Sequence, residues 1–359
     1  MGITIKYNDA LRITSEILTK TGFKEEYANE VANNLVSAEG RGVYSHGLVQ
    51  VAPYVSLFQN GKIKNTTPEI VKDFGAVANI DGKFAPGAVA GNIGMDLAIE
   101  KAKKYGVGVV TVHNGAHFGM AYHYAKRAVE NNMIGFAYTS AGFLVAPYGG
   151  RTRQVGTNPI CIASPAKNRM PIVFDAATSV QAFNKIYFAS VENREIPVGW
   201  AIDKNGNDTT DPNEAMEGCL LPFGGYKGYG LGFMIQIITA ILSGTQMRPD
   251  QERQMSDPHS SGYHFMAIDI ARFVDLDQFT DEVSYYADNV VHSEKRPGVD
   301  RIYLPGEIEF EKEEKAKEKA NKPLQARTKG EKKHIDTRSS NVDLEKYNER
   351  YEQIAPANK

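Results

Sequence analysis

The sequence predicts an α/β protein without the usual dinucleotide-binding sequence fingerprint. Between residue 70 and about residue 139, short apolar runs of strand length alternate with segments of helix length, which is typical of layered α/β structure. No G-x-G-x-x-G follows a predicted strand, and the glycine run at 87–94 has the wrong spacing. If the chain binds a dinucleotide, it therefore does so without the glycine-rich motif of Rossmann proteins.

The first 60 residues are expected to form three amphipathic helices. The first has Asn8 as its expected N-cap and Gly22 as its expected stop. Its apolar stripe consists of Ala10, Ile13 and Ile17. Apolar residues at helical spacing then predict a second helix over 28–36 and a third over 51–57.

Strands and helices are expected to alternate along the centre of the chain. The predicted strands are 76–80, 107–112, 134–139, 159–163, 171–174, 200–203 and 265–270. The predicted helices are 88–105, 120–131 and 229–242. The last of these is apolar nearly all round, so we expect it to be buried on most sides. Asn205-Gly206 predicts a hairpin turn.

A charged low-complexity stretch covers 309–336. Its first half has Lys and Glu at i,i+4 spacing, which predicts a solvated helix, and its second half resembles a linker. Because positive and negative side chains are mixed in this stretch, a solvated surface is favoured over a functional basic tail. A short final helix is expected within 342–354.

Composition excludes several classes of protein. The formal net charge is -2, which argues against a nucleic-acid partner. Two cysteines make neither a disulfide framework nor a cysteine-based zinc site. The N-terminus has no signal-peptide pattern, and no apolar run is long enough to span a bilayer. We expect a cytoplasmic protein without a membrane partner.

The most distinctive segment is 41–47, Arg-Gly-Val-Tyr-Ser-His-Gly. It places Ser45 beside His46 in a turn. Imidazole exchanges protons near neutral pH, and an adjacent hydroxyl can orient it. This pair alone is equally compatible with an ordinary loop histidine.

A second segment, 113–119, follows a predicted strand and precedes a helix. Ligands of α/β sheets bind beyond the carboxyl ends of strands, where helix N-termini attract phosphate. His113 and His117 have the spacing of a metal pair on a helix, but Asn114-Gly115 between them disfavours a helix there. The sequence predicts no metal site.

A third segment, 222–230, surrounds Lys227 with glycines at the start of a predicted helix. Glycine permits close approach of backbone to a ligand, and a lysine at a helix N-terminus favours a bound anion. The order of residues is not that of a Walker A loop. A mobile loop with a surface lysine is the competing interpretation.

Together these segments resemble the type 2 malate/L-lactate dehydrogenase family, in order from about residue 5 to 310. The matching motifs are Arg-Gly-x-x-Ser-His-Gly (41–47), Gly-x-His-Phe-Gly (115–119), Ala-Pro-Tyr-Gly-Gly (146–150), Gly-Thr-Asn-Pro (156–159), Asp-Ala-Ala-Thr-Ser (175–179), Gly-Tyr-Lys-Gly-Tyr-Gly (225–230) and Tyr-x-Pro-Gly-Glu (303–307).

The resemblance implies a homodimer in which a cofactor domain with a mixed, non-Rossmann sheet is inserted in a helical domain formed by the two chain ends. For this chain the expected domains are 1–75 plus 309–359 and 76–308. Implied site residues are His46 as the proton donor and acceptor, Ser45 as its partner, and His117 as a second active-site histidine. The implied contacts to NAD or NADP are Ser140, Asp175, Ala176, Ala177, Lys227, Gly306, Glu307 and Ile308.

Two positions depart from the family pattern. Many relatives have an arginine for the substrate carboxylate where this chain has Gln50, and an acidic residue where it has Gln236. A glutamine cannot supply the charge or the bidentate geometry of arginine. We therefore expect Arg41 or Lys185 to bind the carboxylate beside Gln50, with Arg153 as a further candidate.

The expected reaction is hydride transfer between the cofactor and a small 2-hydroxy or 2-oxo acid, with malate or lactate as the first candidates. The main competing hypothesis is another activity of the family, such as ureidoglycolate oxidation or imino-acid reduction. Two further hypotheses are a non-catalytic nucleotide-binding paralogue and a binding module built on 309–336.

Overall fold

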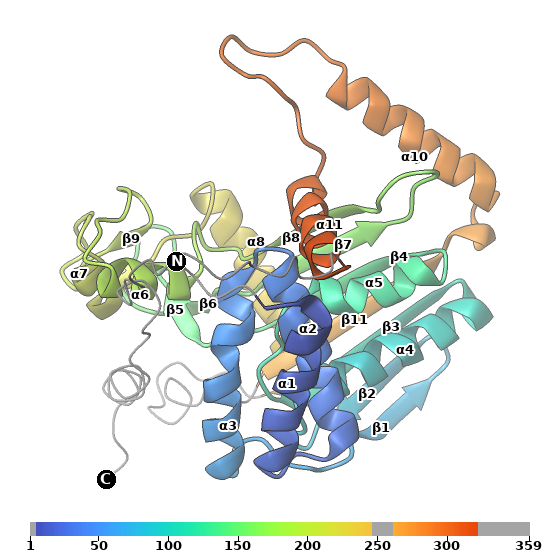
Figure 1. Ribbon diagram of the computed structural model, residues 1–359, viewed down its shortest axis with the longest axis horizontal. Helices are drawn as coiled ribbons and strands as arrows, with labels where there is room; N and C mark the ends of the chain where they lie inside the picture. Colours follow the sequence, from blue (N-terminus) through green and yellow to red (C-terminus); the bar gives the residue numbers. More distant parts are fainter. Residues whose placement is uncertain (1–4, 246–260, 322–359) are drawn as a thin grey trace, which may run out of the picture.

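A computed structural model of the chain describes residues 5–245 and 261–321 (Figure 1). Its main helices are α1 (Tyr7–Lys20), α2 (Glu25–Gly40), α3 (Val51–Gln59), α4 (Gly87–Tyr105), α5 (Tyr122–Glu130), α6 (Phe183–Val191), α7 (Pro212–Glu217), α8 (Tyr226–Gln236), α10 (Leu276–Val291) and α11 (Glu307–Asn321). Short 3-10 turns are η1 (Tyr44–His46), η2 (Leu48–Gln50) and η4 (Ile270–Arg272), and η3 (Ile237–Ile241) is a π-helical turn. The predicted helix at 342–354 lies outside the described residues.

Two mixed sheets form the strand layer. The strands are β1 (Glu69–Phe74), β2 (Val77–Asp81), β3 (Val107–Gly115), β4 (Met133–Thr139), β5 (Phe143–Val145), β6 (Val155–Gly156), β7 (Ile160–Ser164), β8 (Ile172–Ala176), β9 (Ala201–Ile202), β10 (Cys219–Leu220) and β11 (Ser261–Asp269). The larger sheet has the order β1-β2-β3-β11-β4-β7-β8, and the smaller has the order β6-β5-β10-β9.

The larger sheet is mostly antiparallel. β2 and β3 pair in parallel, whereas β11 pairs antiparallel with both β3 and β4. This arrangement confirms a mixed α/β fold instead of a doubly wound parallel sheet. Each predicted strand has a counterpart, but β1, β5, β6 and β10 were not predicted. Three of these four are only two or three residues long, too short to produce an alternating pattern.

Helices cover the larger sheet. Figure 1 shows α4 and α5 lying along one face, where their alanines and Met95 pack against Val110, Val112 and Phe265 in a buried core. On another part of the sheet, Ile235 of α8 and Ile238 of η3 pack with Tyr138 and Ile160. Beside the smaller sheet, α6 and α7 contribute Ile186, Ala189 and Met216 to a second core.

The first helix differs in detail from its prediction. It begins after Lys6, not Asn8, and its buried residues are Ala10, Thr14 and Leu18. Ile13 and Ile17 remain exposed. The buried residues recur at every fourth position. The helix face that packs against the neighbouring helices is therefore rotated relative to the predicted apolar stripe.

Helix α8 is also more exposed than predicted. Its buried residues include Gly232, Ile235 and Gln236, but Phe233 is 48% exposed and Met234 is 53% exposed. The prediction of burial on most sides is therefore wrong for a single copy of the chain. Apolar composition identifies a surface to be covered but does not say whether the same chain covers it.

The C-terminal helix α11 packs against the N-terminal helices (Figure 1). Glu313 is buried in this contact. The first half of the predicted charged stretch is thus helical, but one of its faces is not solvated. β1 belongs to the larger sheet and lies before residue 76, on the helical side of the expected domain boundary. Among the described helices, none is long and apolar enough to cross a membrane.

Candidate active site

The Ser45-His46 pair lies in the turn η1, between α2 and α3. Ser45 Oγ is 2.9 Å from His46 Nδ1. Glu39, at the end of α2, accepts a hydrogen bond from the Leu48 backbone N–H at 2.9 Å. A side chain at Gly47 would collide with the Glu39 carboxylate, so glycine permits this close return of the chain. The turn is therefore anchored on both sides of the histidine.

His117 comes from the segment that joins β3 to α5. Tyr54 of α3 is placed with its hydroxyl 3.0 Å from both His117 Nδ1 and the His117 carbonyl oxygen. The rings of His46 and His117 stack with centroids 5.8 Å apart and planes inclined by 19°. Folding thus brings together two of the three motifs that the sequence singled out.

Burial sets the charge state of this group. It lowers the pKa of His46 to about 4 and raises the pKa of Tyr54. Near neutral pH, His46 is therefore an uncharged imidazole and Tyr54 an un-ionised phenol. A neutral imidazole can accept a proton, and a neighbouring hydroxyl can donate to or accept from its other nitrogen.

The amide of Gln50 contacts the backbone of the same turn. Its Nε2 donates to the Ser45 carbonyl oxygen at 2.8 Å, and Asn184 Nδ2 of α6 donates to that oxygen at 3.0 Å. Gln50 is 8% exposed, so its amide supports the turn and does not extend into solvent. Asn184 was missed because no local pattern marks it. Its neighbour Lys185, a predicted substrate ligand, is exposed.

Arg41 does not lie where a substrate ligand was expected. It is 2% exposed, and its Nη1 forms an ion pair with Glu313 of α11 at 2.7 Å. A guanidinium already paired with a buried carboxylate is not available to a substrate carboxylate in this conformation. Arg153 donates to the carbonyl oxygens of Met216 and Gly218 and is likewise engaged.

The residues expected to contact the cofactor lie at several strand ends. Asp175 and Ala176 end β8, Ala177 follows them, and Asp175 Oδ2 accepts the Tyr122 N–H at 2.9 Å. Although Asp175 is exposed in the described structure, desolvation of its carboxylate raises its pKa to about 6. Ser140 follows β4, and its Oγ accepts the Gly262 N–H at 2.9 Å.

Gly306 directly precedes α11, and Glu307 and Ile308 are the first residues of the helix. A side chain at Gly306 would approach Val173 of β8 to 2.9 Å. Glu307 is ion-paired with Arg301, and Ile308 is 42% exposed. The two groups of predicted cofactor-binding residues, 175–177 and 306–308, therefore lie on neighbouring elements, the end of β8 and the start of α11.

The glycine-rich segment leads into α8. Gly224 and Gly225 have positive φ angles, and a side chain added at Gly224 would meet nothing within 4 Å. Lys227 is exposed in the first turn of the helix. Open space beside Gly224 and a cation at a helix N-terminus fit a phosphate group of a dinucleotide.

His113 and the Gln236 side-chain oxygen have structural partners, whereas Gln236 Nε2 is buried without one. His113 Nδ1 lies 3.0 Å from Asn79 Oδ1, so His113 faces β2 while His117 faces α3. Gln236 Oε1 accepts from Asn158 Nδ2 at 2.5 Å and from the Gly156 N–H at 3.2 Å. Within residues 5–245 and 261–321, no group of three or more His, Cys, Asp or Glu side chains could hold a metal ion.

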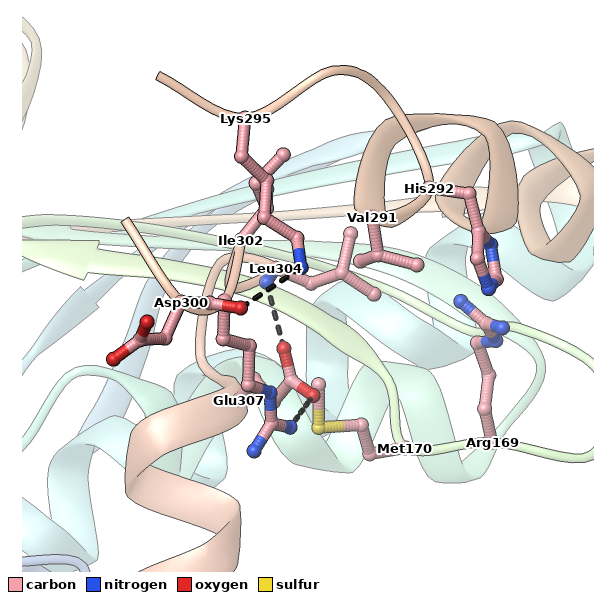
Figure 2. Close-up of a pocket in the computed structure, with 10 residues that line it drawn as sticks. Arg169, Met170, Val291, His292, Lys295, Asp300, Ile302, Leu304 and Glu307 are labelled. Carbon is pink, nitrogen blue, oxygen red and sulfur yellow. Dashed lines mark hydrogen bonds and ion pairs between the residues drawn. The ribbon is translucent and has the colours of Figure 1, made fainter. Parts of the chain in front are cut away.

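A cavity of about 410 Å³ has a lining that includes His292 but neither His46 nor His117 (Figure 2). Its lining runs from Arg169 and Met170 through 291–304 to Glu307. Lys295 donates to the Asp300 carbonyl oxygen, and Arg301 pairs with Glu307 within the view. Its lining includes neither His46 nor His117, so we do not assign the hydride-transfer chemistry to it.

The comparisons with known proteins agree on one family. A profile of the malate/L-lactate dehydrogenase family matches residues 5–328, beyond the end of the resemblance noted in the sequence. A malate/(S)-sulfolactate dehydrogenase of Methanothermus fervidus is 40% identical over 298 residues, which is 82% of this chain and 86% of that protein. A ureidoglycolate dehydrogenase (NAD(+)) of Escherichia coli K12 is 34% identical over 306 residues, covering 83% and 86%.

The fold is shared with a solved structure. The crystal structure of malate dehydrogenase from Entamoeba histolytica superposes with a TM-score of 0.85 at 32% identity. The match covers 88% of this chain and 92% of that one.

Proposed function

The chain belongs to the malate/L-lactate dehydrogenase family of NAD(P)-dependent enzymes acting on CH–OH donors, and from this premise we propose that its substrate is a small 2-hydroxy or 2-oxo acid, with malate or lactate first. The observation that carries the proposal is the stacked pair of His46 and His117, with Ser45 and Tyr54 each bonded to one imidazole. Two oriented imidazoles suit the proton transfer that accompanies oxidation of an alcohol.

His46 takes the hydroxyl proton during oxidation and returns it to the carbonyl oxygen during reduction. Its lowered pKa keeps it in the proton-accepting form at neutral pH. When Ser45 accepts a hydrogen bond from Nδ1–H, the lone pair of Nε2 is free for the substrate proton. The imidazolium formed in this way keeps its Nδ1–H bonded to the Ser45 oxygen, and its Nε2–H returns the proton to the substrate during reduction, which leaves the neutral imidazole again.

His117, whose ring centroid lies 5.8 Å from that of His46, would help to orient the substrate. Tyr54 holds it at two atoms, so the ring is fixed relative to α3. A positioned second imidazole can hydrogen-bond the substrate oxygen without itself changing protonation.

NAD or NADP, when bound, supplies or accepts the hydride at the nicotinamide ring. Lys227 and the backbone of Gly224 and Gly225 would hold a phosphate, because they combine positive charge with open space. Asp175 would accept a hydrogen bond from a ribose hydroxyl. Ser140, residues 176–177 and residues 306–308 complete the proposed contacts.

Lys185 is proposed to bind the substrate carboxylate. It is exposed and directly follows Asn184, whose amide contacts the Ser45 carbonyl oxygen. An unpaired carboxylate loses several kcal/mol when it leaves water, so a cation near His46 is required.

The test follows reduced-nicotinamide absorbance with NADH or NADPH and a panel of oxaloacetate, pyruvate, sulfopyruvate and a cyclic imino acid, and the reverse reaction with ureidoglycolate. We expect turnover of oxaloacetate or pyruvate. Turnover of ureidoglycolate or the imino acid alone would replace the proposed substrate, and absence of turnover with every compound would refute the proposed reaction.

Ureidoglycolate oxidation is the second candidate. The observation in its favour is Gln50, which supplies a neutral amide instead of the arginine expected for a simple 2-oxo acid. The relative from Escherichia coli with that name also shares most of the chain.

We also propose that the protein is a homodimer. Exposed apolar side chains gather on α8 and η3, namely Leu231, Phe233, Met234, Ile241 and Leu242. A contiguous apolar surface of this kind favours a partner, and a second copy is the partner that the family resemblance implies. Sedimentation should give twice the mass of one chain at micromolar concentration. A fully active monomer would contradict this.

A further inference from the structure

The guanidinium of Arg41 is enclosed by two aromatic rings and a carboxylate. Its Cζ lies 4.3 Å from the ring centroid of Tyr122 and 4.2 Å from that of Phe310. Glu313 Oε2 is 2.7 Å from Nη1. A planar guanidinium can stack on aromatic faces and pair with a carboxylate at once, which a lysine ammonium cannot do.

The carboxylate on the other side of this contact is charged. Although burial opposes ionisation, hydrogen bonds from Lys317 and Arg41 hold the pKa of Glu313 below its usual value. The side chain of Glu313 is 10% exposed and that of Arg41 is 2% exposed. Each charge is therefore compensated by the other at a site with little water.

Arg41 begins the segment that carries His46. Gly42 follows it with φ +77°, and a side chain at Gly42 would approach Lys312 Cδ of α11 to 2.7 Å. Val43 and Phe310 are both packed against the large core beneath α4 and α5. Helix α11 therefore contacts the turn at its first residues.

The same aromatic rings connect Arg41 to the end of β8. The Tyr122 ring meets the Phe310 ring at 75° with centroids 5.7 Å apart, and the Tyr122 N–H donates to Asp175 Oδ2. The Val173 N–H donates to the Pro305 carbonyl oxygen at 3.1 Å, just before α11. Helix α11 thus contacts both the His46 turn and the strand that carries Asp175.

We propose that Arg41 is a positioning residue, which together with Glu313 and the rings of Tyr122 and Phe310 fixes the His46 turn relative to the Asp175 end of β8. This inference rests on the proposed function, in which His46 moves the proton and Asp175 contacts the cofactor. The competing role of Arg41 is that of the substrate ligand expected from the sequence. The two roles predict different changes in kcat and KM.

The experiment uses the full chain and compares Arg41→Lys, Glu313→Gln, the double variant and the control Asp73→Asn. The control also removes a carboxylate that pairs with a cation less than 10% exposed, Lys101, but that pair joins β1 to α4 and involves no residue of the junction. A displaced reacting group lowers turnover steeply, so we expect kcat to fall about tenfold to a hundredfold in both single variants. KM for the acid substrate should change by less than about threefold.

The double variant tests whether the two residues act through one contact. Because either single change already breaks the ion pair, kcat of the double variant should lie within about twofold of the lower single variant. Asp73→Asn should keep wild-type kcat. If Arg41→Lys raises KM about tenfold at unchanged kcat while Glu313→Gln has no effect, Arg41 is a substrate ligand and the inference is overturned.

Amide hydrogen exchange gives a result that does not depend on turnover. In Glu313→Gln, peptides covering 42–50 and 173–178 should exchange faster than in the wild type, and in Asp73→Asn they should not. Unchanged exchange in Glu313→Gln, or equal acceleration in the control, would overturn the inference. If exchange changes as expected but the wild type turns over no substrate, the proposed function fails and the positioning role of Arg41 remains.

Discussion

The segment 41–50 and helix α11 meet at one junction but carry opposite sequence signals. The segment has a compact motif, and His46, Ser45 and Gln50 form hydrogen bonds within it. Helix α11 has a repetitive Lys/Glu composition that predicts a solvated surface. In the structure α11 nevertheless supplies the carboxylate that pairs with Arg41 at the start of the motif.

The two regions differ in how well the local sequence describes the role of each residue. Within α11, the side chain of Glu313 is 10% exposed while that of Lys315 is 70% exposed. From composition alone, both residues are expected to be solvated charges, yet Glu313 is part of a buried ion pair. Charge patterning therefore describes the average face of a helix and misses the single residue that faces the core.

The largest expected effect tests the proposed proton transfer by His46 in segment 41–50. His46→Ala should lower kcat by roughly two to four orders of magnitude, because a general acid and base is lost. Cofactor affinity, measured by nicotinamide fluorescence, should remain near that of the wild type. The matched control is His113→Ala, which removes an imidazole that faces Asn79 and should leave kcat close to normal. Normal turnover in His46→Ala with an inactive His117→Ala would transfer the role to His117.

A smaller effect is expected from Gln50→Arg, which tests whether this position recognises substrate or supports the turn. Loss of the bond to the Ser45 carbonyl oxygen costs about 1 kcal/mol, so kcat should fall several-fold. KM for malate or lactate should change little. Asn184→Ala removes the other donor to the same oxygen and should have a similar effect on kcat. Strong malate or lactate activity that appears only in Gln50→Arg would show that the native substrate is not a simple 2-oxo acid.

Buried histidines, of which His46 is one, decide how the stability of the fold responds to pH. Burial lowers the pKa of His46 and His264 to about 4 and that of His123 to about 3, against 6.5 for an ordinary histidine. Between pH 6.5 and 4 the unfolded chain binds protons that these native histidines do not, so stability should fall as pH falls. Asp175, with a pKa raised to about 6, opposes this trend below pH 6.

Each of the three histidines costs about 2 kcal/mol between pH 7.5 and pH 5 and Asp175 offsets about 1 kcal/mol, so we expect a net loss of about 5 kcal/mol. Urea unfolding at the two values measures it. His264→Phe should make the dependence shallower, since the aromatic contact with Tyr138 is kept while the titrating group is removed. Stability that rises on acidification in this range would contradict the assignment of neutral buried imidazoles.

The smallest effect is expected on the solvent side of α11. Lys315→Ala removes a side chain whose ion pair with Glu311 spans 3.7 Å at the surface. Exposed pairs contribute little, so the free energy of unfolding should change by less than about 0.5 kcal/mol and kcat should not change. A loss comparable to that of Glu313→Gln would mean that the position of a charge on the helix does not matter.

Much of the fold could be predicted because it depends on local patterns. The strands β3, β4 and β7 contain mostly apolar runs, and α4 is followed by Gly106, which has φ +86°. Helices α6, α7 and α10 were missed: α7 is only six residues long, and α10 lies in a region with no distinctive motif. Asn184 was missed together with α6, because its role depends on a contact 139 residues away.

The amino-acid sequence by itself determined the family, the alternation of strands and helices, and the two histidines of the proposed chemistry. Each of these can be recognised from short segments of the chain. The tertiary structure decided the pairing of β11 between β3 and β4, the stacking of His46 on His117, and the partner of Arg41, which lies 272 residues away. These features arise from contacts between distant segments, and the energy of a buried charge depends on the groups around it, not on its neighbours in the chain. Arg41 is accordingly one of three candidate cations for the substrate in the sequence and the partner of a buried carboxylate in the fold.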